Sequence, residues 1–169
     1  MKATAPWQYH GDDKTDIDSV HALWGGPKYI ELWNNDAAAW VPGSLYMIDF
    51  TAGALSTYGN PSTAIIAAAT VAGQHKSLGI AVDATAQGAK GRIQVYGKYA
   101  GANVLSTSGP AAGDLLVGSL TTAGRLIKWN HAIDEAGSAT LTVVLPIALC
   151  LTTPASNQAD IFIFNKWGI

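Results

Sequence analysis

The chain has 169 residues, of which 49% are hydrophobic and 13% are charged, and its formal net charge is −2. This length is enough for one domain with a sizeable core, and the near-zero net charge argues against nucleic acid or an anionic membrane as a partner. The single cysteine, Cys150, excludes an intramolecular disulfide. No apolar stretch reaches the roughly 20 residues of a membrane span, and the first seven residues lack the apolar core of a signal peptide, so we expect synthesis in a cytoplasm.

Residues 1–40 differ from the rest of the chain, because they are rich in aromatic and acidic residues and have weak apolar periodicity. We expect an extended N-terminal arm here, whose aromatic side chains must be covered by its own domain or by a partner. Within the arm, residues 18–24 fit one or two helical turns, and residues 28–33 alternate as a strand does. The candidate partner-binding residues at the two ends of the chain are Trp7, Tyr9, Trp24, Tyr29, Trp33 and Trp167.

From residue 41 to residue 164 the pattern predicts strands separated by glycine-containing turns. The clearest element is a β-hairpin over residues 77–97, in which apolar residues alternate with small or polar ones on either side of a turn at residues 87–91. The alanine-rich run at residues 62–71 fits a helix by propensity, whereas its threonine and valine flanks favour a strand. We favour the strand.

Three short matches at nearly one spacing indicate an internal repeat, although strands of any all-β chain resemble one another. The matched pairs are Gly43 with Gly113, Ile80 with Ile147, and Ile93 with Ile161. Two such units can close on each other and so shorten their exposed strand edges. We therefore predict an all-β fold: one β-sandwich or barrel-like domain over residues 41–164, built from two approximate repeats, between the arm and a tail of residues 165–169.

The repeat also predicts a single core shared by the hairpin and a weaker partner over residues 145–164. Its expected members are Ile80, Val82, Ile93, Val95, Ile147, Leu149, Ile161 and Ile163. Replacement of Val95 by a polar residue should then unfold the domain, because it would bury a polar group without a partner.

No set of residues demands a particular reaction, metal or cofactor. The acid-rich run at residues 10–18 departs from the calcium-loop pattern, and a solvated or partner-facing arm fits it better. None of the four histidines has zinc-ligand spacing, and no Gly-x-Ser-x-Gly motif is present. Asp49 and Asp83 could face each other as glycosidase carboxylates, but an aspartate beside a turn usually bonds the backbone. We expect neither an enzyme nor a bound cofactor.

The hairpin and its second copy carry a family resemblance. The residues concerned are Ser77 to Ala86 with Gly91 to Gly97, Ala111 to Val117 with Thr122 to Arg125, and Ile147 to Leu149 with Ile161 to Ile163. In these segments the chain resembles the capsid cement, or decoration, proteins of tailed bacteriophages. The resemblance covers about residues 41–164 and leaves residues 1–40 outside it.

This resemblance implies a small β-rich subunit on the outer surface of a virion head. Such a subunit forms a homotrimer and clamps neighbouring major capsid protein subunits once the head has expanded. Other interpretations stay open: a carbohydrate-binding β-sandwich with Trp33, Trp40 or Trp129 as sugar platforms, a trimeric enzyme with its site between subunits, and another virion part such as a head fibre base or tail protein. The first of these requires that Trp40 and Trp129 do not simply fill the core.

Overall fold

The computed structural model of the chain describes residues 26–49, 63–69, 76–129 and 145–164. The strands are β1 (Lys28–Asn34), β2 (Leu45–Ile48), β3 (Thr63–Ile66), β4 (Ser77–Ala81), β5 (Lys90–Asn103), β6 (Leu115–Gly118), β7 (Leu126–Lys128), β8 (Ala148–Cys150) and β9 (Gln158–Ile163), and the short 3-10 helix η1 (Ser106–Ser108) follows β5. The predicted all-β fold is confirmed, and β3 lies in the run for which a strand was favoured. Within the described ranges, no helix is long and apolar enough to cross a membrane.

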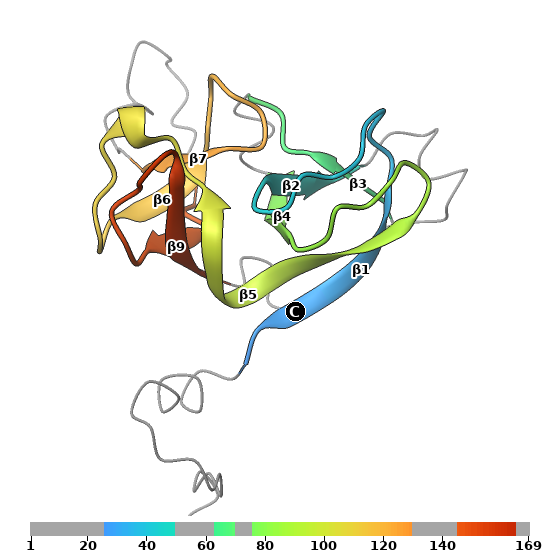
Figure 1. The fold of residues 1–169 in the computed structure, drawn as a ribbon, viewed down its shortest axis with the longest axis horizontal. Coiled ribbons are helices and arrows are strands. Elements are labelled where there is room, and N and C mark those ends of the chain that lie inside the picture. Colours follow the sequence, from blue (N-terminus) through green and yellow to red (C-terminus); the bar gives the residue numbers. More distant parts are fainter. Residues whose placement is uncertain (1–25, 50–62, 70–75, 130–144, 165–169) are drawn as a thin grey trace, which may run out of the picture.

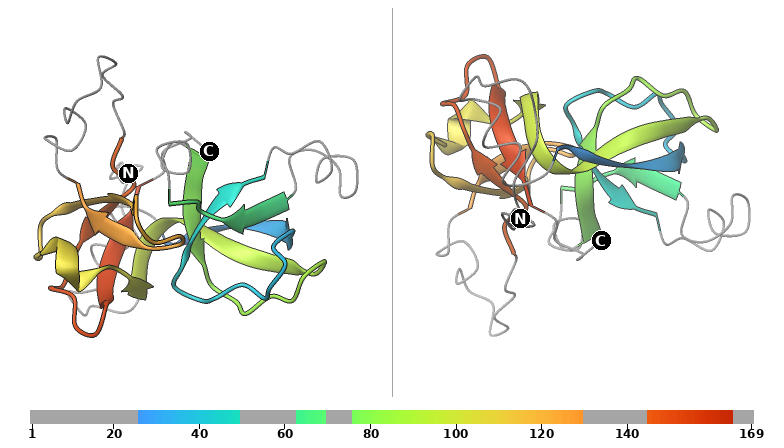
Figure 2. Two further views of the ribbon diagram at one scale, coloured as in Figure 1. Left: turned by 90° about the horizontal axis from the view of Figure 1, so that it is seen from above. Right: turned by 90° about the horizontal axis from the view of Figure 1, so that it is seen from below.

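The strands form one hydrogen-bonded sheet in the order β1-β3-β2-β4-β5-β9-β8-β6-β7, and β1 also pairs with β5. This additional pairing closes β1, β3, β2, β4 and β5 into a five-stranded barrel. Strand β5 then continues out of the barrel, where its second half pairs with β9. Figure 1 shows β5 passing from the group of β1 to β4 to the group of β6, β7 and β9, and Figure 2 shows the two groups side by side.

The second group repeats the hydrogen bonding of the barrel, which confirms the predicted duplication. The strand order β3-β2-β4-β5 is matched by β7-β6-β8-β9. At the turn before β2, the N–H of Gly43 donates to the carbonyl of Ala81 at 2.9 Å, and before β6 the N–H of Gly113 donates to the carbonyl of Cys150 at 2.8 Å. Both glycines have positive φ, 84° and 93°, a conformation that favours glycine.

The end of β5 has the same place in the second group that β1 has in the barrel. Asn34 of β1 pairs in parallel with Ala64 of β3, and Val104, just after β5, makes a parallel bridge with Leu126 of β7. One long strand therefore ends the first unit and begins the second.

One match in the predicted repeat is wrong by two residues. Ile80 pairs with Gln94 in the first unit, and Leu149 pairs with Phe162 in the second. Ile80 therefore corresponds to Leu149 and not to Ile147. A shift of two residues keeps every side chain on the same face of a strand, so apolar alternation does not detect it.

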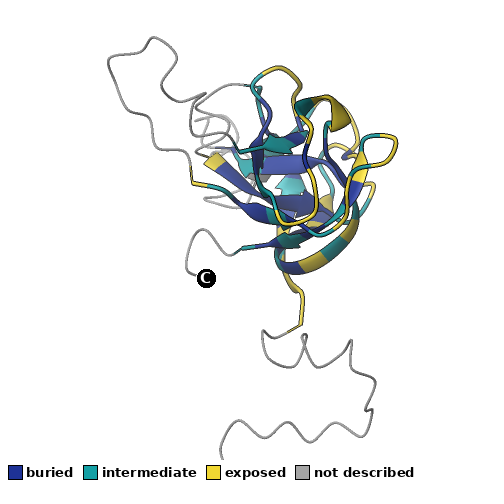
Figure 3. Ribbon diagram, turned by 90° about the vertical axis from the view of Figure 1, so that its left-hand side faces the viewer, coloured by how far each residue is buried: buried dark blue, intermediate teal, exposed yellow. Residues whose placement is uncertain are grey.

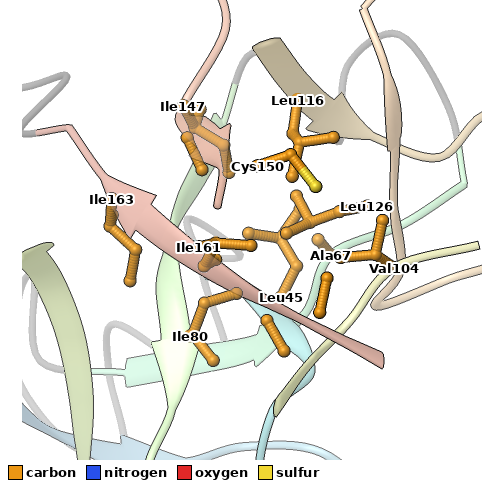
Figure 4. Close-up of a cluster of buried hydrophobic side chains, with 13 residues drawn as sticks. Leu45, Ala67, Ile80, Val104, Leu116, Leu126, Ile147, Cys150, Ile161 and Ile163 are labelled. Atoms are coloured by element: carbon orange, nitrogen blue, oxygen red, sulfur yellow. The ribbon is translucent and has the colours of Figure 1, made fainter. Parts of the chain in front are cut away.

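The core consists of two clusters, where a single shared core was predicted. One fills the barrel and contains Leu32, Trp40, Tyr46, Ala64, Leu78, Ala81, Ile93 and Val95. The other has 13 members and fills the second group and its contact with the first. Figure 4 shows side chains of Leu116, Leu126 and Cys150 close together within it. Ile80 joins Ile147, Ile161 and Ile163 in this second cluster, as predicted, whereas Val95 does not. The barrel has its own interior because the pairing of β1 with β5 closes it, whereas the second cluster also takes in Leu45, Ala67 and Ile80 of the first group.

Buried residues lie mainly in the strands, and exposed residues lie in the connecting loops and along parts of β1 and β5 (Figure 3). Two residues of the predicted core, Val82 and Leu149, are only half-buried. Val82 follows the last residue of β4, and Leu149 alternates in β8 with the buried Ala148 and Cys150. How far such a position is covered depends on tertiary packing, which alternation alone does not show.

Residues 28–40 belong to the β-domain, so the predicted arm boundary at residue 40 does not hold for them. The alternation over residues 28–33 correctly indicated a strand, which pairs with β5 from Lys28 to Trp33. Trp40 is 1% exposed and lies in the barrel cluster. This strand closes the barrel, because it pairs with β3 on one side and with β5 on the other. Residues 1–25 and 165–169 lie outside the described ranges.

Candidate docking surface

A row of aromatic and cationic side chains runs over the outer surface of β1, β5 and β9, and we call it the aromatic–cationic strip. Alternate residues of a strand point to one face, which places Lys90, Arg92 and Tyr96 of β5 on this side. Gln94 lies between Arg92 and Tyr96 but is only 3% exposed. The members of the strip are Lys28, Tyr29, Trp33, Lys90, Arg92, Tyr96, Lys98, Phe162 and Phe164. All of them are exposed or half-buried.

The barrel half of the strip is formed by the pairing of β1 with β5. Trp33 pairs with Lys90, whose ammonium lies 5.2 Å from the centre of the indole ring. The guanidinium of Arg92 lies 5.7 Å from the centre of the Tyr29 ring, and Tyr29 is 44% exposed. Each contact is a cation–π pair, worth about 0.5–1 kcal/mol at an exposed site. The pairs hold two aromatic rings and two cations in fixed positions on a closed barrel.

The other half lies where β5 passes from one unit to the next. The ammonium of Lys28 is 5.6 Å from the Tyr96 ring centre. The Tyr96 ring meets Phe162 edge-on at 5.4 Å, and Phe162 lies 6.1 Å from Phe164. Edge-to-face and tilted geometries at these distances are favourable for aromatic pairs. The Lys28 ammonium at the start of β1 and the phenyl rings at the end of β9 therefore meet at Tyr96 of β5.

The charges of the strip are only partly neutralised. Arg92 makes an ion pair with Asp83 at 2.9 Å, and Lys98 makes one with Asp160 at 3.2 Å. Among the described residues, neither Lys28 nor Lys90 has a carboxylate within ion-pairing distance. Glu31 pairs directly with Arg92 between Tyr29 and Trp33 and is exposed. The strip therefore presents cations together with one carboxylate to whatever covers it.

The ion pair of Asp83 with Arg92 predicts a small pH effect on stability. The hydrogen bond from Arg92 holds the pKa of the Asp83 carboxyl below its usual range. Because this pKa is lower in the folded than in the unfolded chain, ionised Asp83 stabilises the fold above the ordinary Asp pKa of about 4. This stabilisation is lost as the pH falls from there through the folded-state pKa. Both side chains are exposed, at 37% and 50%, so the pair contributes at most about 1 kcal/mol.

Asp83→Asn should accordingly lower the free energy of unfolding by less than about 1 kcal/mol at pH 7 and by a smaller amount near pH 3. Urea unfolding of the wild type and of Asp83→Asn at both pH values measures this difference. The other titrating groups affect the two proteins equally, so their effects cancel in the comparison. An equal loss at pH 3 and pH 7 would assign the effect to packing and not to the charge.

Two further carboxylates near the barrel, Asp36 and Asp49, have structural partners. Asp49 is 2% exposed and accepts a hydrogen bond from the Asn35 side chain at 2.5 Å, while Asp36 accepts the N–H of Ile66 at 2.8 Å. Burial, with a smaller effect of the Asp49 charge, raises the pKa of Asp36. Asp83 also accepts the N–H of Arg92 at 3.3 Å, the backbone role expected beside a turn. Across the described ranges, no group of three or more His, Cys, Asp or Glu residues could hold a metal ion.

The structure brings together two of the six candidate residues. Tyr29 and Trp33 lie on one face of β1 and belong to the strip, whereas Trp7, Tyr9, Trp24 and Trp167 fall outside the described residues. The strip residues of β5 and β9 were not singled out from the sequence. In the sequence these residues stood out only as the polar or aromatic positions of an alternating strand, which predicts that they face outward but not that they bind anything.

Trp40 and Trp129, the other two candidate sugar platforms, differ in how far they are buried. Trp40 fills the barrel core and offers no sugar platform, and Trp129 is half-buried. The chain matches no protein-family model, no curated protein and no solved structure.

Proposed function

We propose that the protein is a capsid cement, or decoration, protein of a tailed bacteriophage. It docks on the outer surface of the expanded head and stabilises contacts between subunits of the major capsid protein. The observation that carries the proposal is the aromatic–cationic strip, an ordered surface for protein contact on a rigid closed barrel. The choice of partner, the virion localisation and the homotrimer are supported by the resemblance of residues 77–97 and their second copy to that family.

The strip has the composition of an energetic centre in a protein interface. Tyr, Trp and Arg dominate binding hot spots, and interfaces are enriched in aromatic residues and arginine. The rings of Tyr29 and Trp33 are already oriented by cations of β5, so docking orders few side chains and their entropy cost is small. Only 13% of the chain is charged, so the surrounding surface is easily desolvated. We propose that Trp7, Tyr9, Trp24 and Trp167 add further anchors.

The stabilisation itself follows from mass action. A protein that binds the expanded shell but not its dissociated or unexpanded form shifts the equilibrium toward the expanded shell. Head expansion creates the docking surface. Pressure from packaged DNA then stresses the contacts between major capsid protein subunits, which the bound protein holds together. No chemical step is required of any residue.

Replacing Tyr29 and Trp33 together by alanine should weaken binding to expanded heads by roughly 30-fold or more, because two aromatic anchors are lost. Co-sedimentation of purified protein with undecorated expanded heads measures this, with unexpanded heads as the negative control. Val41→Ala is the matched control: Val41 is 52% exposed and precedes β2, which pairs with β3 and β4 and not with the strands of the strip. Binding by the double variant at wild-type strength would remove the strip from the interface.

A second candidate function is favoured by one observation, the placement of Tyr29 and Trp33 on the same face of β1. Four residues along a strand separate them by about 13 Å, a spacing at which two rings could stack on one polysaccharide chain. Retention of the wild type on a polysaccharide column, lost on Trp33→Ala, would support this carbohydrate-binding function. A head fibre base or tail protein would use the same surface, and labelled protein in images of virions would place it away from the head shell.

A further inference from the structure

The outer face of the barrel is covered by the second group. Leu45 of β2 pairs with Ile80 of β4, and their neighbours Tyr46 and Ala81 point into the barrel, so Leu45 and Ile80 lie on its outer side. Both belong to the cluster of the second group, together with Ala67 (Figure 4). They are 0% and 1% exposed, which shows how completely one unit covers this pair of the other.

The second group repeats these contacts at equivalent positions. Leu115 of β6 pairs with Leu149 of β8. The N–H of Trp129, just after β7, donates to the carbonyl of Leu115 at 2.8 Å, and the same bond joins the residue after β3 to the first residue of β2 in the barrel, at 3.0 Å. Leu115 and Leu149 are therefore the counterparts of the covered pair.

This second pair is much less covered than the first. Leu116 and Cys150 beside it belong to the second core, so Leu115 and Leu149 face outward, and both are only half-buried. Phe162 of β9 pairs with Leu149 and is half-buried as well. Leu115, Leu149 and Phe162 form an apolar row across three neighbouring strands, which we call the outer row. Further burial of this row would be favourable.

The charges around the outer row are almost all neutralised within the chain. Five charged residues are described in the second group, and four of them form the ion pairs Lys98–Asp160 at 3.2 Å and Lys128–Asp114 at 2.9 Å. The fifth is Arg125, in the turn before β7. Two copies of this surface can therefore approach each other with little repulsion, whereas two copies of the strip would bring its cations together.

We propose that the outer row is the surface at which copies of this chain meet. The contact between the two units supports this occupant, because the equivalent pair in the barrel packs against another unit of the same architecture. A second copy supplies such a unit, and closed oligomers of identical chains bury the same patch on every copy. This contact belongs to the homotrimer of the proposed function and rests on that part of it, while Tyr29 and Trp33 of the strip remain available to the capsid.

Sedimentation velocity of the full-length protein over a range of concentrations tests this assignment. The wild type should associate. Leu115→Arg/Leu149→Arg should weaken the association by roughly 100-fold or more, because each arginine would be buried at the contact without a partner. Tyr29→Ala/Trp33→Ala is the control and should associate as the wild type does, since both residues lie on the strip. Circular dichroism checks that each variant is folded.

Carbene footprinting of the wild type needs no substitution and decides the case in which the arginine variant does not fold. Labelling of the Leu115 and Leu149 side chains should fall several-fold as the protein concentration is raised and the copies associate. Labelling of Val41, which is 52% exposed and lies before β2 in the first group, should stay constant.

Three outcomes would overturn the proposal. The first is a wild type that remains monomeric at every concentration, and the second is a folded arginine variant that associates as strongly as the wild type. The third is labelling of Leu115 and Leu149 that does not change as the protein associates, which would place the contact elsewhere. None of these measurements uses capsids, so their failure leaves docking on heads to the co-sedimentation experiment, and failure of that experiment leaves the contact between copies intact.

Discussion

Val95→Asp is expected to unfold the β-domain. Val95 is 5% exposed and belongs to the cluster that fills the barrel. A carboxylate at this position would be buried among apolar side chains without a partner, at a cost of several kcal/mol. Domains of this size are stable by about 5–15 kcal/mol, so the variant should lose its cooperative melting transition in circular dichroism.

The matched control for this change is Val95→Ala, which removes volume without adding charge. It should fold and lose only about 1–3 kcal/mol in urea unfolding. A Val95→Asp protein that melts at the wild-type temperature would show that Val95 faces solvent, and the barrel interior would have to be reassigned.

Gly79→Ala is expected to have the second largest effect, through the backbone of the hairpin. A Cβ at this position would lie 2.1 Å from the carbonyl oxygen of Gln94 and 2.9 Å from its carbonyl carbon. These are main-chain atoms of β5, so the added methyl must push β4 and β5 apart where Ile80 pairs with Gln94. We expect a loss of at least about 3 kcal/mol in the free energy of unfolding.

Gly26→Ala is the control for Gly79→Ala, because an added Cβ there meets nothing within 4 Å. Its stability should stay within about 0.5 kcal/mol of the wild type. If urea unfolding gives the same small change for both variants, then β4 and β5 are not in the close contact that places Gly79 against Gln94.

The strands were predictable because alternation of apolar and polar residues is a local signal. The hairpin of β4 and β5 is close in sequence, and its second copy was visible as a repeat. Closure of the barrel was not predictable, because it depends on pairing Lys28–Trp33 with residues 90–96, which are far apart in the chain. The division into two cores follows from that closure and could not be derived without it.

The candidate site was predictable only in part, for the same reason. Tyr29 and Trp33 were found because large aromatic residues in a polar segment need a cover. Lys90, Tyr96 and Phe162 were missed, since each looks ordinary on the outside of a strand until the register places it beside a ring or a cation. A surface strip is a property of strand pairing, and composition alone does not reveal it.

The most direct test of the proposed docking is a cryo-electron microscopy reconstruction of undecorated expanded heads incubated with the purified protein. We expect added density on the outer shell, with the face of β1, β5 and β9 turned toward the major capsid protein and the ring of Trp33 at the contact. Heads that stay bare, or bound protein whose strip faces solvent, would contradict the proposed docking.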